Sequence, residues 1–301
     1  MQIAFTAHPL PVAGQRAFFF NPDSYRASLR KLDAAGFSGF IVDDAGGLLS
    51  NLDLAADVGR QTSRLSVIAT HWPGVMSPVI SARQLAYLDN LVGGRLSLRM
   101  GVDQEAAEEG SAHERTCARV EEYLTLLKRL WSNDRPFDHE GRFYSIRNGF
   151  VAEKSIQGPS IAIRMSGRTG TAMQAAARHA TIFELALDSN YEIARQISRV
   201  QAAARSFGRE GKISFALSVP VDRIHAVIAS GQPAAAKIAI YLLPFAELGI
   251  SEFIITGFGS DAVMRLIGTD VSKLLANTLE RHSEKLSVAD GGDVPGALRL
   301  S

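Results

Sequence analysis

Cysteine is almost absent from this sequence, which has a single one, Cys117, among 301 residues. One cysteine cannot form a disulfide within the chain, and it cannot supply the set of thiolates that a cysteine-based metal site needs. No metal site is therefore predicted. Cys117 lies in a segment with helical spacing, where we expect a passive, packed side chain rather than a nucleophile.

The sequence also lacks an excess of charge of one sign and lacks long apolar runs. Lys and Arg number 32 and Asp and Glu number 31, for a net charge of +1, which gives no electrostatic signature of nucleic-acid binding. The apolar runs are shorter than the roughly 20 residues that span a bilayer. The first residues, from Met1, lack the charged and then apolar segments of a secretory signal. We expect no nucleic-acid partner, no membrane span and a cytoplasmic location.

What the sequence does contain is a regular alternation of short apolar runs and amphipathic segments. The predicted strands are residues 2–7, 39–42, 65–70, 95–100, 160–165, 181–187, 213–221 and 252–256. The predicted helices are residues 23–35, 52–61, 78–91, 114–131, 170–179, 191–207, 234–248 and 261–282. Parallel strands need crossover helices, and eight strands can close a barrel. The pattern favours an α/β fold of the (β/α)8 TIM-barrel type, with an open doubly wound sheet as the alternative.

Two segments depart from this alternation. Residues 133–159 contain two prolines and three glycines and predict a short insertion between the fourth helix and the fifth strand. Residues 287–301, with Gly291, Gly292 and Pro295, predict a flexible C-terminal tail. We therefore expect one barrel domain over residues 1–286.

The run from His71 to Leu96, HWPGVMSPVISARQLAYLDNLVGGRL, resembles the alkanesulfonate monooxygenase branch of the bacterial luciferase-like, flavin-dependent monooxygenases. Residues 137–144 (FDHEGRFY) and 175–180 (AAARHA) are similar to further segments of that family. The resemblance implies the same barrel, reduced FMN as cofactor, a separate flavin reductase that supplies it, and a homodimer formed by the second and third helices. Apolar residues there would permit such an interface: Leu52, Leu54, Leu85 and Leu88.

Reactive groups of barrel enzymes lie where strands end and the following loops begin. The resemblance places Thr70 and His71, at the end of the third strand, under the flavin ring, although His71 could instead be a packed or capping residue. It also places His113 at the flavin pocket, with Thr116 where the family has a tyrosine. An exposed helix cap is the alternative for His113. His71 and His113 are thus the catalytic candidates. Arg99 could face the same mouth or form a salt bridge on the barrel rim.

The segment Ser166-Gly-Arg-Thr-Gly170 lies between the fifth strand and the fifth helix. Free backbone N–H groups at a helix N-terminus bind anions, and an arginine can add a charge-assisted hydrogen bond. The segment resembles the Gly-Gly-Ser-Ser sequence that holds the FMN phosphate in the family, so Ser166, Gly167, Arg168 and Thr169 are the cofactor candidates. A simple helix cap is the alternative.

Some family features are missing. Ser218 and Pro220 stand near the positions where the family has a His or Arg facing the substrate, and residues 223–232 replace its long lid. Residues 101–110 are acidic. No nucleotide fingerprint for NAD(P)H is present, which agrees with a separate reductase.

We therefore favour a two-component, FMN-dependent monooxygenase acting on a small organic molecule, without alkanesulfonate as a named substrate. The alternatives are a catalytically impaired flavin-binding or scaffold homologue and a deazaflavin-dependent oxidoreductase.

Overall fold

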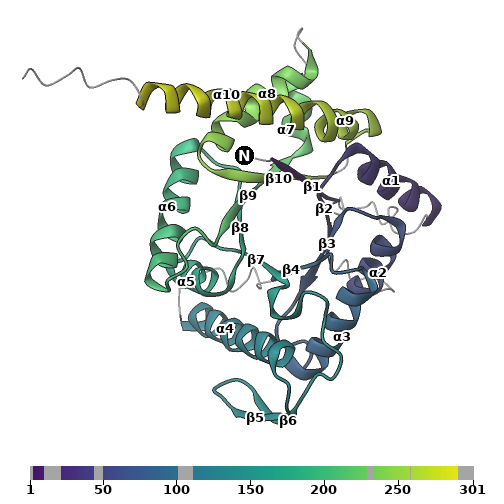
Figure 1. The fold of residues 1–301 in the computed structure, drawn as a ribbon, viewed down its shortest axis with the longest axis vertical. Coiled ribbons are helices and arrows are strands. Elements are labelled where there is room, and N and C mark those ends of the chain that lie inside the picture. Colours follow the sequence, from purple (N-terminus) through teal and green to yellow (C-terminus); the bar gives the residue numbers. More distant parts are fainter. Residues whose placement is uncertain are drawn as a thin grey trace, which may run out of the picture.

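Eight parallel strands close into a barrel in the computed structural model, which describes residues 3–9, 22–43, 50–100, 111–228, 233–257 and 259–290. They are β1 (Ala4–His8), β2 (Gly39–Val42), β3 (Ser66–His71), β4 (Leu96–Met100), β7 (Ala162–Ser166), β8 (Ile182–Ala186), β9 (Ser214–Pro220) and β10 (Ile250–Thr256). Figure 1 shows the closed ring, in which β1 pairs with both β2 and β10. The predicted TIM barrel is confirmed, and the open sheet is excluded.

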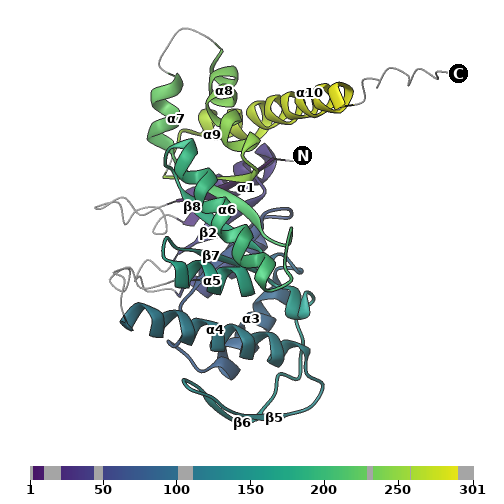
Figure 2. The same ribbon diagram turned by 90° about the vertical axis from the view of Figure 1, so that its left-hand side faces the viewer.

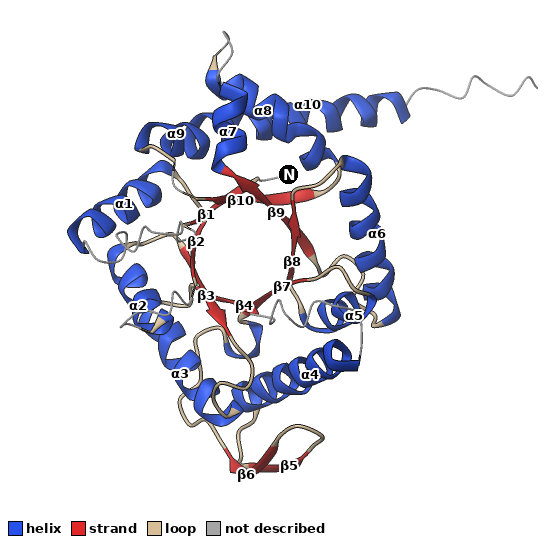
Figure 3. Ribbon diagram, turned by 180° about the vertical axis from the view of Figure 1, so that it is seen from behind, coloured by secondary structure: helices blue, strands red, loops and turns tan. Residues whose placement is uncertain are grey.

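Helices surround the barrel, as Figure 3 shows. They are α1 (Pro22–Ala35), α2 (Asn51–Gln61), α3 (Pro78–Leu91), α4 (Ser111–Ser132), α5 (Gly170–His179), α6 (Asn190–Ser206), α7 (Val221–Ile228), α8 (Ala234–Glu247), α9 (Asp261–Leu266) and α10 (Ser272–Asp290). Among the described residues, no helix is long and apolar enough to cross a membrane.

The C-terminal third differs from the predicted elements in two places. The short helix α7 forms where only a connection is predicted, because Val221 and Ile224 share one buried face too short to read as a period. The last predicted helix is divided by a π-helical turn, Ile267–Val271. The described helix α10 runs to Asp290, so it includes the first four residues of the segment predicted as a tail.

The insertion is an antiparallel hairpin, β5 (Phe137–Glu140) and β6 (Ser145–Gly149), preceding a 3-10 turn at Gly158–Ser160. Its tip is held by Glu122 of α4, whose carboxylate accepts the backbone N–H groups of Phe143 and Tyr144, each at 3.0 Å. In Figure 2 the hairpin lies at the opposite end of the molecule from α7 and α8. The predicted insertion is thus confirmed, with a location far from those helices.

Most of the apolar core lies between the strands and the helices, where Phe5, Phe40, Leu85, Trp131 and Phe253 are among the largest buried side chains. Inside the barrel the apolar contribution is a small cluster of Ile41, Ile68, Ala216 and Ile254. The remainder of the barrel interior is polar and charged, which sets the chemistry of the site.

Three of the four leucines suggested for a dimer face belong to this outer core. Leu54, Leu85 and Leu88 are 9%, 0% and 4% exposed, because their helical faces cover the strands. These three leucines are therefore not available for a dimer interface, which corrects the expectation for them. The exposed apolar residues of α3 are Ile80 and Tyr87.

Gly268 provides a test of the packing that divides the last helix. A Cβ added to Gly268 would lie 2.4 Å from the backbone oxygen of Ala35, whereas one added to Gly170 meets no atom within 4 Å. We expect Gly268→Ala to lower the free energy of unfolding by about 1–3 kcal/mol, the usual cost of overpacking. Urea denaturation measures it, with Gly170→Ala as the matched control; equal effects of the two would contradict the close approach.

Candidate active site

Alternate residues of each strand point toward the barrel axis. Phe5 and Ala7 of β1 belong to the outer core, so Thr6 and His8 face inward. The same alternation directs Thr70 of β3 and Arg99 of β4 into the barrel. These strands end at one edge, the C-terminal mouth, where βα loops begin.

Two carboxylates and an arginine pair with one another inside the barrel. Glu252 of β10 accepts the hydroxyl of Thr6 at 2.6 Å. Arg164 of β7 donates to both oxygens of Glu252, at 2.9 and 3.1 Å, and to Glu184 of β8 at 2.6 Å. Arg164 is 2% exposed, so its charge depends on these two partners.

Arg99 extends this arrangement to the mouth. Its guanidinium donates to Glu184 at 2.7 Å and to Asp43 at 3.3 Å. Asp43, which follows β2, also contacts His8 Nε2 at 2.5 Å and accepts the hydroxyl of Thr70. We refer to Glu252, Arg164, Glu184, Arg99 and Asp43 as the buried ion network.

The two arginines hold the carboxylates in their charged form. Burial raises the pKa of Glu184, but the charges of Arg164 and Arg99 outweigh that effect and lower it. Burial likewise raises the pKa of Asp43, while hydrogen bonds from His8 and Thr70 and the charge of Arg99 bring it down to about 2. Each positive group thus lies between two negative ones.

Thr70 and Arg99 both lie at the mouth, where each donates a hydrogen bond to Asp43; their roles as cofactor candidates stay predictions. Arg99 forms ion pairs, which agrees with the alternative of a salt bridge, although its position is inside the barrel rather than on the outer rim. Its exposed side-chain fraction is 27%.

His113 and Thr169 are also brought together. His113 Nε2 lies 2.6 Å from the Thr169 hydroxyl, and that same hydroxyl accepts the N–H of Ala172 at 3.2 Å as the N-cap of α5. Cys117, one turn further along α4, lies with its sulfur 3.5 Å from His113. Burial and the charge of Glu121 raise the pKa of the Cys117 thiol, which agrees with a passive cysteine.

The turn before α5 depends on a glycine with positive φ. Gly167 has φ of +150°, and a Cβ there would lie 2.4 Å from that of Ala172, so a side chain is excluded. Gly170 borders open space at the first turn of the helix. Arg168 is exposed and pairs with Asp188 at 2.8 Å, and Ser166 is exposed at the end of β7.

The opposite end of α5 is capped by cations. Arg209 donates to the backbone oxygens of Ala177 and Ala180, each at 2.7 Å, and Lys128 donates to that of His179 at 3.1 Å. Positive charge at a helix C-terminus complements the helix dipole. The helix is thereby fixed with its N-terminal N–H groups toward the mouth.

His71 lies in a different environment. It shares the outward direction of Val67 and Ala69 on β3, and its Nε2 is 2.6 Å from the hydroxyl of Tyr123 on α4. The two rings stack with centroids 5.5 Å apart. Burial lowers the pKa of His71 to about 4, so the ring is neutral near pH 7. This geometry favours the packed interpretation of His71, and its catalytic role stays a prediction.

Five residues of this site are missed by sequence reasoning: His8, Asp43, Arg164, Glu184 and Glu252. A signal is present for three of them, because Arg164, Glu184 and Glu252 are each the single charge of a short apolar strand. The ion pairs of the network join residues up to 88 positions apart, so no local sequence pattern predicts which residues pair.

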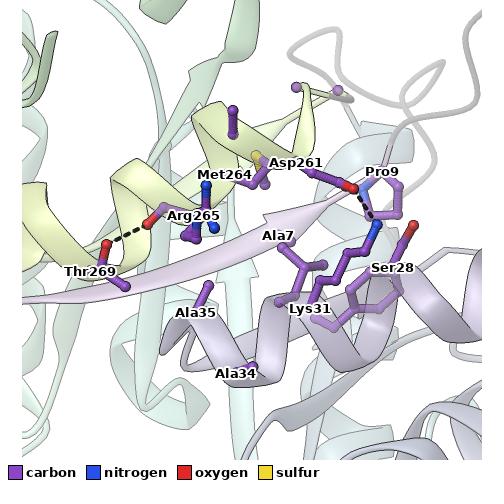
Figure 4. Close-up of a pocket in the computed structure, with 15 residues that line it drawn as sticks. Ala7, Pro9, Ser28, Lys31, Ala34, Ala35, Asp261, Met264, Arg265 and Thr269 are labelled. Atoms are coloured by element: carbon purple, nitrogen blue, oxygen red, sulfur yellow. Dashed lines mark hydrogen bonds and ion pairs between the residues drawn. The ribbon is translucent and has the colours of Figure 1, made fainter.

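Two cavities lie away from the mouth. One, of ≈ 550 Å³, lies between α1 and α9 on the outside of the barrel wall; Figure 4 shows Lys31 paired with Asp261 across it. The other, of ≈ 330 Å³, lies at the N-terminal end of the barrel and reaches Arg164 and Glu252.

Among the described residues, no group of three or more His, Cys, Asp or Glu could hold a metal ion.

A closed barrel with polar groups gathered at the C-terminal mouth defines a barrel enzyme of the kind that binds its ligands there. A family model described as luciferase-like monooxygenase matches residues 2–243. The chain belongs to that family, so the predicted membership of the luciferase-like family is confirmed.

Two curated relatives share part of the chain. The FMNH(2)-dependent dimethylsulfone monooxygenase of Pseudomonas putida is 30% identical over 158 residues, 50% of this chain and 43% of the relative. Its counterpart in Pseudomonas fluorescens (strain Pf0-1) is 33% identical over 120 residues, 38% and 33% of the two chains. The match therefore spans less than half the length of these relatives.

Solved structures share the fold over most of the chain. A long-chain alkane monooxygenase has a TM-score of 0.78 at 13% identity, with 92% of each chain covered. A riboflavin lyase has a TM-score of 0.76 at 16% identity, again with 92% of each chain covered. A coenzyme F420-dependent tetrahydromethanopterin reductase from Methanopyrus kandleri has 0.74 at 14%, with 91% of this chain and 100% of the other covered. At these identities the likeness shows the fold alone.

The low pKa of Asp43 predicts how stability depends on pH. A carboxyl whose pKa falls from 3.8 to about 2 on folding contributes about 2 kcal/mol above pH 4, and the contribution is lost as the pH falls toward 2. Asp43→Asn should lower the unfolding free energy by that amount at pH 7, measured by denaturant titration. The difference from the wild type should close between pH 4 and pH 2; a constant difference would contradict the ion pairing.

Proposed function

We propose that this protein is a two-component monooxygenase that takes reduced FMN from a separate flavin reductase and oxygenates a small, uncharged organic molecule. Membership of the luciferase-like monooxygenase family and the named activity of its partial relatives support reduced FMN as the cofactor. The observation that carries the proposal is the contact of His113 with Thr169 at the N-terminus of α5, on the mouth of the barrel.

The residues at that helix end fit a flavin phosphate. Helix N-terminal N–H groups lack partners within the helix, and they attract anions. Gly170 leaves open space beside them, and Gly167 keeps the preceding turn free of a side chain. In the proposed function Ser166, Gly167, Arg168 and Thr169 hold the phosphate, with Arg168 able to exchange its exposed partner Asp188 for it.

The flavin ring is assigned to the mouth beside Thr70 and His113, where reduced FMN would supply the electrons that activate dioxygen. The residues of the chain bind and orient the ring and exclude water from it. Arg99 supports these residues without binding the ring itself, because both of its hydrogen-bonded neighbours are carboxylates.

The class of substrate follows from the charges. Of the described residues that face the barrel axis, the cations Arg99 and Arg164 each lie between two carboxylates. By strand alternation, β8, β9 and β10 present Ala186, Ser218 and Thr256 at the mouth, none of them charged. A sulfonate or carboxylate would have no unneutralised cation there, so an uncharged substrate is proposed. A homodimer and a cytoplasmic location remain part of the proposal.

Cofactor choice and turnover can be tested together. Anaerobic titration with FMN, reduced FMN and a deazaflavin should give the tightest binding for reduced FMN. Oxygen uptake is then measured with supplied reduced FMN and dimethylsulfone as the first probe of an uncharged panel. Product formed with less than one hydrogen peroxide per oxygen supports the proposal. Stoichiometric peroxide with every probe would favour the impaired homologue, and preference for the deazaflavin would favour the hydride-transfer alternative.

The phosphate assignment predicts a difference between two helix caps. Thr169→Ala should weaken FMN binding by about tenfold, the effect of one charge-assisted hydrogen bond, and should leave the binding of riboflavin, which has no phosphate, unchanged. Fluorescence quenching of each flavin measures both affinities.

Ser189→Ala is the matched control, since Ser189 caps α6 as Thr169 caps α5, accepting the N–H of Glu192 at 3.3 Å. Both substitutions remove a cap and cost about 1 kcal/mol of stability. An equal loss of riboflavin and FMN affinity in Thr169→Ala would place the phosphate elsewhere.

A further inference from the structure

Among the described residues of the mouth, His8 is the buried histidine that contacts a carboxylate. It ends β1, is 4% exposed and faces the barrel axis from the same side of the strand as Thr6. The other mouth groups in contact with Asp43 are a hydroxyl, Thr70, and a permanently charged guanidinium, Arg99.

Asp43 is placed to orient this imidazole. Its Oδ2 atom lies 2.5 Å from His8 Nε2, while its Oδ1 atom accepts from Thr70 and Arg99. Those two donors fix the carboxylate plane from the β3 and β4 side, so Oδ2 is directed at β1. Since an ionised carboxylate only accepts hydrogen bonds, Nε2 carries the proton, and in the neutral ring the lone pair is then on Nδ1.

The charged groups around His8 are few in the described part of the barrel. Asp43 on β2 contacts it directly, Arg99 on β4 reaches it through that carboxylate, and Glu184 on β8 lies behind Arg99. On the other side, β10 brings Thr256 into register with His8. The imidazole thus contacts one carboxylate, and its register partner on the neighbouring strand is uncharged.

We propose that His8 is a catalytic residue that transfers a proton at the mouth through Nδ1, and that Asp43 is a positioning residue that sets its tautomer. The inference rests on the proposed function. There, dioxygen, reduced FMN and the substrate give oxidised FMN, the oxygenated substrate and water. Of the four electrons that reduce dioxygen, reduced FMN would supply two, together with the two protons of that water, and the substrate would supply the other two. His8 accepts one of these protons at Nδ1 and releases it to the oxygen atom that leaves as water.

The tautomer can be measured without flavin. Long-range ¹H–¹⁵N NMR of histidine-labelled protein distinguishes the two neutral tautomers of each of the seven histidines, and His8→Gln assigns the signal of His8. The wild type should show His8 as the Nε2–H tautomer, and Asp43→Ala should give a mixture of both. The Nδ1–H tautomer in the wild type would overturn the proposal, because Nδ1 could not then accept a proton.

Turnover is the second arm. His8→Ala should lower the rate of product formation on the order of a hundredfold, the usual contribution of a general acid–base group, and added imidazole should restore part of it. His282→Gln is the control: this exposed histidine of α10 pairs with Glu247 at 2.9 Å and lies outside the site. Flavin affinity of His8→Ala, determined in parallel, should stay within twofold of the wild type.

The two arms separate this inference from the function on which it rests. If wild-type protein oxygenates dimethylsulfone and His8→Ala does so at an unchanged rate, the proton role is wrong while the function stands. If the wild type binds no flavin, the proposed function fails and the role of His8 fails with it. His8→Gln serves the kinetic comparison should the alanine variant not fold.

Discussion

The ion pairs of Arg99 are the constraint on which the mouth of this barrel depends. A guanidinium inside a barrel is stable only with partners for its charge. Arg99 pairs with Glu184 on one side and with Asp43 on the other. Glu184 in turn shares Arg164 with Glu252. Removing any one of these charges takes a charged partner away from at least one buried neighbour. The arrangement therefore ties the ends of β2 and β4 to the strands on the far side of the barrel.

The network also explains why the arginines at the mouth and below it carry no unpaired charge. Both arginines are neutralised, so they stabilise the carboxylates instead of attracting an external anion. Asp43 receives three donors and remains ionised, which orients His8 and Thr70. In the described residues of this member of the luciferase-like monooxygenase family, the arginines inside the barrel are thus already paired with carboxylates.

Helix α5 supplies the second fixed point of the site. Cations at its C-terminal end and the Thr169 cap at its N-terminal end hold the helix in place. His113 joins that cap to the start of α4. The proposed phosphate position is therefore set by two helices and the barrel wall, with the conformation of the turn depending on Gly167.

The barrel could be predicted from the sequence because its signals are local. Alternating apolar runs and amphipathic helices give the element order, and Ser77-Pro78 marks a capped helix start that the structure retains. Family resemblance named His113 and Thr169 as separate flavin candidates, and their mutual contact is seen only in the structure. By contrast, α7 has only one short buried face, and the turn at Gly268 depends on the distant carbonyl of Ala35.

The ion network could not be predicted for the same reason. His8 and Asp43 are 35 positions apart, and Arg164 and Glu252 are 88. In the sequence each is an isolated polar residue within or next to a strand, and only the closed barrel brings them together. His71 illustrates the converse, since its place after a strand suggested the mouth while strand alternation directs it outward to Tyr123.

The central claim is that an oxygen atom from dioxygen is transferred to an uncharged substrate. The most direct test supplies reduced FMN and ¹⁸O₂ to the protein with a panel of small sulfones, thioethers and alkanes, and examines the products by mass spectrometry. The account predicts one ¹⁸O atom per product molecule from at least one member of the panel. Unlabelled product, or label recovered only in hydrogen peroxide while the protein binds reduced FMN, would contradict it.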